Sequence, residues 1–95
     1  MRTMLTVQLP VETGNAAIKD GRIAKVIQAT TERIKPESAY FFTRDGRRTM
    51  QFVFDMASSA DIPVVGEPFF MELDAAVEFT PVMNPAELQQ GLSKI

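Results

Sequence analysis

The side chains that could do chemistry in this chain are carboxylates, lysines, arginines, amides and one tyrosine, because it contains no histidine and no cysteine. Without imidazole and thiolate groups, the sequence excludes a His-ligated haem, a zinc site of the usual kind, and a Ser-His or Cys-His nucleophile pair. We therefore expect no metal and no bound cofactor. Any catalysis has to use the remaining acids, bases and amides, or an organic cofactor borrowed from elsewhere.

Four polar side chains gather around an expected helix start: Asn15, Lys19, Asp20 and Arg22. The apolar stripe of the following helix, continued backwards, falls on Lys19 and Asp20. Either the helix bends near Gly21 and turns both charges outward, which we favour, or both charges face the sheet. A lysine buried beside a carboxylate could transfer protons, whereas the simpler interpretation is an exposed helix start.

Two further groups of charged side chains have both a functional and a simpler interpretation. Glu78 falls in the middle of an expected strand, where a desolvated carboxylate could be a general base, but an ion-paired or hydrated glutamate is the commoner outcome. Arg44, Arg47 and Arg48 surround an expected turn. They could hold an anionic ligand, although arginines beside an edge strand more often prevent edge-to-edge pairing of sheets.

The clearest structural element is a β-hairpin over residues 38–56, with Asp45 and Gly46 as its turn. This turn places Arg44 opposite Arg47, and alternate residues then point to opposite faces. One face is entirely apolar and requires a core: Ala39, Phe41, Met50, Phe52 and Phe54. The other face is half apolar and half polar: Ser38, Tyr40, Phe42, Thr49, Gln51 and Val53.

Hydrophobic periodicity and helix-capping residues place the other elements. Pro68 falls inside the second main helix and is expected to kink it. The expected elements are a strand over 3–9, a helix capped by Thr13 or Asn15 that ends at Ile34, the hairpin, a helix over 62–73, a strand over 75–82, and a short helix capped by Asn84.

This order of elements predicts one α+β domain over residues 1–95 with the ferredoxin-like βαββαβ arrangement and a short C-terminal helix. Right-handed crossovers put both main helices on one face of an antiparallel four-stranded sheet in the order 4-1-3-2. The helix-covered face is expected to contain Leu5, Val7, Leu9, Phe41, Phe52, Phe54, Val77 and Phe79. The open face is expected to contain Met4, Thr6, Gln8, Tyr40, Phe42, Gln51, Val53, Glu78 and Thr80.

The open face is the best-supported functional surface. It could be a solvated antiparallel face, which is common, but its apolar side chains favour an interface with a second copy. The candidate residues of this dimer face are Met4, Gln8, Tyr40, Phe42, Gln51, Val53 and Glu78.

Composition limits the other partners. The net charge is −2 and the pI is about 5.0, so we expect no nucleic-acid partner, because phosphate binding needs a basic surface. No apolar run approaches the roughly 20 residues that span a bilayer, and we expect no membrane partner. A cytoplasmic location is the default expectation.

The order of elements, the chain length and the open-face chemistry together resemble the dimeric α+β barrel superfamily. This superfamily includes the antibiotic-biosynthesis monooxygenase type, muconolactone isomerase and stress-responsive barrel proteins. Segments 13–21, 67–70 and 80–84 also look similar to a group of small uncharacterised bacterial proteins. No catalytic motif of a named enzyme family is matched, and the histidine of the haem-binding members is absent.

The resemblance implies that open sheet faces pack in pairs to form a homodimer. It also implies a pocket between the helices and the sheet. Its wall would be Phe41, Phe52, Phe54, Phe69 and Phe70, and its polar rim would be Asn15, Lys19, Asp20 and Arg22. The alternative interpretation makes the phenylalanines ordinary core.

Two functions remain open at this point. The first is binding or transformation of a small apolar or aromatic compound without metal or haem, in the manner of a monooxygenase or isomerase. The second is a non-catalytic interaction or regulatory module. A closed apolar cavity with converging polar groups would favour the first, and a filled core with only a dimer seam would favour the second.

Overall fold

The computed structural model describes residues 1–95 and contains one antiparallel sheet and four helices. The strands lie in the order β2-β3-β1-β4, which is the expected order 4-1-3-2 read from the other edge. The elements are β1 (Arg2–Gln8), α1 (Val11–Asp20), α2 (Arg22–Ile34), β2 (Ser38–Arg44), β3 (Arg47–Asp55), α3 (Asp61–Leu73), β4 (Ala76–Pro81) and α4 (Pro85–Leu92).

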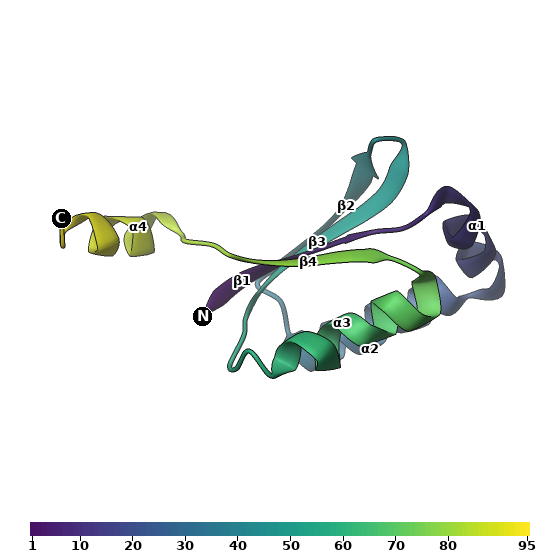
Figure 1. The fold of residues 1–95 in the computed structure, drawn as a ribbon, viewed down its shortest axis with the longest axis horizontal. Coiled ribbons are helices and arrows are strands. Elements are labelled where there is room, and N and C mark those ends of the chain that lie inside the picture. The colour runs from purple at the N-terminus through teal and green to yellow at the C-terminus, as the bar shows by residue number, and fades with distance from the viewer.

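Two of the helices, α2 and α3, form one layer on one side of the sheet (Figure 1). α2 and α3 run side by side beneath the strands, and α1 lies at one end of the molecule. α4 projects from the opposite end, beyond the last residue of β4, and covers neither face of the sheet. The molecule is therefore elongated, with extents of 50 × 27 × 17 Å.

The hairpin has the predicted register. Tyr40 pairs with Gln51 and Arg44 with Arg47, and the turn residues Asp45 and Gly46 have φ angles of 55° and 72°. Positive φ at both positions is the signature of a type I′ turn, whose twist matches that of two antiparallel strands. The turn therefore fixes which hairpin side chains face the helices and which face the open side.

The expected bend at Gly21 is confirmed. Gly21 has φ 82°, a left-handed conformation that glycine adopts without strain, and it separates α1 from α2. Lys19 and Asp20, which the uninterrupted stripe placed toward the sheet, are exposed. The expectation that a bend turns both charges outward is therefore correct.

The first helix begins earlier than the sequence indicated, so the N-cap prediction is wrong. Pro10 holds the N-cap position, and the backbone N–H of Gly14 donates to its carbonyl oxygen at 2.8 Å. No side chain caps this helix start. The Thr13 hydroxyl instead donates to a carboxylate oxygen of Asp74 at 3.2 Å.

The core lies between the sheet and the helix layer. Leu5, Val7, Phe52 and Phe69 are fully buried, and the Phe52 and Phe69 ring centroids are 6.4 Å apart. Phe41 is the exception among the residues predicted for the covered face. It meets Phe52 edge-on at 6.0 Å but remains 57% exposed, because no helix packs over its edge strand β2.

The C-terminal helix is capped as predicted but is not packed. Asn84 Oδ1 accepts from the Glu87 N–H at 2.8 Å, and the Glu87 carboxylate accepts from the Asn84 N–H at 2.9 Å. This reciprocal capping box fixes the start of α4. None of its residues is buried, and Leu88 and Leu92 are exposed.

No helix is both long enough and apolar enough to cross a bilayer. The expected cytoplasmic location stays a prediction.

Candidate functional site

The open sheet face presents three parallel rows of side chains, each of which crosses all four strands. The register of the strand pairs defines the rows, which all point away from the helices. From β2 to β4, the rows are Ser38–Val53–Met4–Thr80, then Tyr40–Gln51–Thr6–Glu78, then Phe42–Thr49–Gln8–Ala76.

Apolar side chains occupy one diagonal of this face. Val53 and Met4 are neighbours in the first row, and both are half-buried. Tyr40 is 68% exposed at the β2 edge, and the half-buried Phe42 lies beside it with the Arg44 guanidinium 5.2 Å from its ring centroid. Tyr40 is therefore the exposed member of this apolar diagonal, and the other three side chains keep part of their surface open to solvent in the single chain.

The centre of the face is polar and internally hydrogen-bonded. The Gln51 amide donates to the Thr6 hydroxyl at 3.3 Å. The Gln8 amide donates to the Arg44 carbonyl oxygen at 3.0 Å and to the Thr49 hydroxyl at 3.4 Å. These contacts hold both amides flat against the sheet, whereas Glu78 is exposed and forms no ion pair within the chain.

A hollow of about 230 Å³ lies on this face near the hairpin turn. Ala76 contributes the smallest side chain to its lining, and Arg44 and Glu78 bring opposite charges to it. The lining residues are Thr6, Gln8, Arg44, Asp45, Thr49, Ala76 and Glu78. The predicted dimer-face residues Gln8 and Glu78 are therefore brought together here with Arg44, which the sequence suggested either as an anion ligand or as protection against edge-to-edge pairing.

The space between the helices and the sheet is filled around Phe52 and Phe69. Neither ring has exposed surface, and neither lines any of five surface pockets. A ligand site lined by Phe41 and Phe52 stays a prediction, for which this state of the chain provides no cavity.

The predicted polar rim is engaged in local contacts. The Arg48 guanidinium donates to the Asn15 side-chain oxygen at 3.0 Å. Arg22 donates to the Asp20 carboxylate through its backbone N–H at 2.9 Å and its Nε at 2.7 Å, and to the Glu72 carbonyl oxygen at 2.6 Å. The Arg22 backbone N–H, followed by its guanidinium, holds the pKa of Asp20 below its ordinary value. The Asn15 contact ties α1 to β3, and the Arg22 contacts tie α1 to α2 and α2 to α3. Of the four rim residues, only Arg22 lines one of these five pockets, at the junction of α2 and α3.

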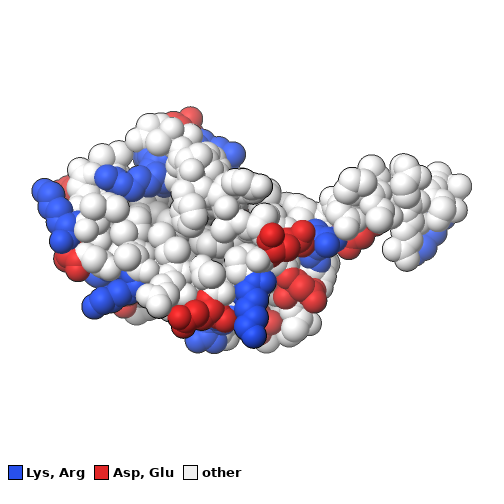
Figure 2. Space-filling view, turned by 180° about the vertical axis from the view of Figure 1, so that it is seen from behind, with Lys and Arg blue, Asp and Glu red and all other residues white.

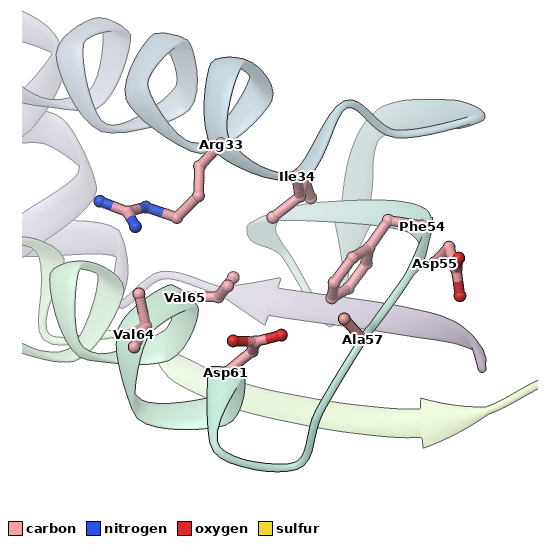
Figure 3. Close-up of a pocket in the computed structure, with 8 residues that line it drawn as sticks. All are labelled: Arg33, Ile34, Phe54, Asp55, Ala57, Asp61, Val64 and Val65. Carbon is pink, nitrogen blue, oxygen red and sulfur yellow. The ribbon is translucent and has the colours of Figure 1, made fainter.

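A second cleft, of about 220 Å³, lies where the end of α2 meets the start of α3 (Figure 3). Arg33, Asp61 and Val64 border it, with Phe54 at its base. The Asp61 carboxylate accepts from the Ser58 N–H at 3.2 Å, which is the contact of a helix start. Sequence reasoning did not find this cleft, because its lining comes from three segments that only the fold brings together.

Charged side chains of both signs are interspersed around a broad uncharged area in Figure 2. No stripe of a single sign crosses that view, in keeping with the net charge of −2. The distribution gives no support to a phosphate-binding surface there.

No family model matches this chain, and no curated protein matches it. Among solved structures, the fold is similar to that of the de novo designed protein Ferredog-Diesel, at 7% sequence identity and a TM-score of 0.51, with 85% of each chain covered. Identity this low shows a shared fold alone. The chain thus has a ferredoxin-like α+β fold, and membership of the dimeric α+β barrel superfamily stays a prediction.

One ion-pair group anchors the projecting helix α4 to the sheet. Arg2, on the open side of β1, donates to the Glu87 carboxylate and, at 2.6 Å, to that of Glu37. The Asn84 backbone N–H holds the pKa of Glu87 below its ordinary value, and Arg2 adds to this effect. A lowered pKa in the folded chain means that the contact stabilises the fold above the ordinary glutamate pKa and is lost as the pH falls through the lowered value.

We predict that Arg2→Gln raises the pKa of Glu87 part of the way to its ordinary value, because the Asn84 N–H remains in place. An NMR titration of the side-chain carboxyl carbons measures this. Arg22→Gln is the matched control, and it should raise the pKa of Asp20 while leaving that of Glu87 unchanged. An unaltered Glu87 titration in Arg2→Gln would show that Arg2 does not anchor α4 in solution.

Proposed function

We propose that this chain is a self-associating interaction module that pairs with a second copy through its open sheet face. The observation that carries the proposal is the apolar diagonal of Met4, Val53, Tyr40 and Phe42 on the open face, in which Tyr40 is exposed and the other three side chains are half-buried. A group of large apolar side chains on one contiguous surface is typical of an interface. A small domain also gains stability from burial between copies that its own core does not supply.

The filled interior also supports this proposal. Phe52 and Phe69 occupy the space in which a ligand would have to lie between helices and sheet. A module without an internal cavity can contact other molecules only through its outer surfaces. The open sheet face is a surface that the helices of the chain leave uncovered.

We predict that Met4→Glu raises the dimer dissociation constant at least about tenfold, because a carboxylate in the middle of an apolar contact loses its hydration on pairing. Sedimentation equilibrium over a dilution series measures it. Thr43→Glu is the matched control, because it adds the same charge on the other face of β2 at an exposed position. A dissociation constant that Met4→Glu leaves unchanged would contradict pairing through this face.

A second candidate function, binding of a small aromatic compound, is favoured by the hollow on the same face. The Arg44 guanidinium lines the hollow, lies over the Phe42 ring and forms no ion pair. An aromatic carboxylate would find a cation and a ring side by side there. Glu78, across the hollow, is the group that could act as a base if the compound were also transformed.

Benzoate is the probe for this second candidate. We predict saturable shifts of the Gln8, Thr49 and Glu78 amide signals during an NMR titration with benzoate. Arg44→Gln should weaken the binding several-fold, whereas Arg47→Gln should not, because Arg47 lies across the turn and does not line the hollow. Signals that stay unshifted at millimolar benzoate, or that shift equally in both variants, would rule the candidate out.

A further inference from the structure

We infer that two copies pair face to face about a two-fold axis, so that Tyr40 of each copy meets Glu78 of the other. The axis lies above the open face, parallel to the strands and over the line midway between β1 and β3. This inference rests on the proposed function and specifies its geometry. It follows from the strand order and from the three rows of side chains on the open face.

The axis exchanges the two halves of the sheet. Because the order is β2-β3-β1-β4, a rotation by 180° about a line between the two central strands places β1 opposite β3 of the second copy and β4 opposite its β2. A rotation about the strand direction leaves positions along the strands unchanged, so each row faces the same row of the other copy. Two-fold pairing of this kind brings one surface against itself.

The contacts that result are chemically complementary. In the first row, Met4 faces Val53 of the second copy, and an apolar side chain meets another. In the central row, Tyr40 faces Glu78 of the second copy. Face-to-face sheets lie about 10 Å apart, a gap that a tyrosine and a glutamate together can bridge with a hydroxyl-to-carboxylate hydrogen bond.

The third row adds a match of shape. Phe42 of one copy faces Ala76 of the other, and Ala76 lines the hollow on the open face. A large ring therefore stands opposite the smallest side chain of the face. In this pairing the hollow receives the Phe42 ring of the second copy, which would leave less room for a small compound.

The other in-plane axis, which runs across the strands, gives a poor match. It reverses the rows, so that Met4 would face the polar side chain of Gln8, and it places Glu78 against Glu78 of the second copy. Two like charges in direct opposition cost several kcal/mol at an interface. The axis along the strands avoids this repulsion and gives both Glu78 carboxylates a donor.

Packed sheets are aligned to within about 30°, and a rotation of that size displaces the residues nearest its centre least, which are Gln51 and Thr6. Tyr40 and Glu78 stand at the two ends of the same row, so the hydrogen bond between copies depends on the reach of both long side chains. Within one chain, the two residues lie on opposite edge strands, about 14 Å apart across three strand spacings, and cannot pair with each other.

A charge-swap experiment tests the pairing. Tyr40→Glu sets two carboxylates against each other between copies and should raise the dimer dissociation constant at least about tenfold. Adding Glu78→Lys to Tyr40→Glu restores opposite charges and should return the constant to within about threefold of wild type. Sedimentation equilibrium measures each constant, and Thr43→Glu on the other face of β2 should leave it unchanged.

Circular dichroism tests whether each variant folds. We expect each to fold, because Tyr40, Thr43 and Glu78 are all exposed. A double variant that dimerises no better than Tyr40→Glu, in a protein whose wild type dimerises, overturns this pairing and leaves the proposed function standing. A wild type that remains monomeric at about 100 µM, where micromolar affinity would be visible, overturns both.

Discussion

The structure depends on one constraint: a four-stranded sheet has two faces, and this chain has helices for only one of them. α2 and α3 cover the side that contains Leu5 and Phe52, and no helix covers the other side. α4, the remaining candidate, projects beyond the end of the sheet. The open face is therefore a consequence of topology, and its apolar side chains are the feature on which the proposed pairing with a second copy rests.

The chemistry of the chain follows the same division. On the covered side, the Phe52 and Phe69 rings pack against each other, and Arg22 donates hydrogen bonds to Asp20 at the junction of α1 and α2. On the open side, the glutamine amides donate hydrogen bonds to hydroxyls of the neighbouring strand. The exposed side chains of Tyr40 and Glu78 lie at opposite edges of the sheet. The groups left free are those that a second copy can join.

Local sequence signals predicted the fold well, because each acts within a few residues. Asp45 and Gly46 fixed the hairpin register, Gly21 fixed the helix break, and Asn84 with Glu87 fixed the start of α4. The exposure of Phe41 was not predictable, because alternation along a strand tells which face a residue takes but not how far the helices extend over it. The hollow beside Ala76 was missed for a similar reason, since its lining comes from four strands and a turn that only the sheet register assembles.

The most direct test of the central claim is an isotope-filtered nuclear Overhauser experiment on a mixture of ¹³C-labelled and unlabelled chains. Met4 and Val53 are also neighbours within one chain, so the experiment has to separate the two kinds of contact. The isotope filter does so, because it retains only contacts between different molecules. The account predicts intermolecular cross-peaks from the Met4 methyl group to Val53, and none from the fully buried Phe69 ring. A sample in which the open face gives no intermolecular cross-peak, or in which such peaks arise only from the outer surfaces of α2 and α3, would contradict it.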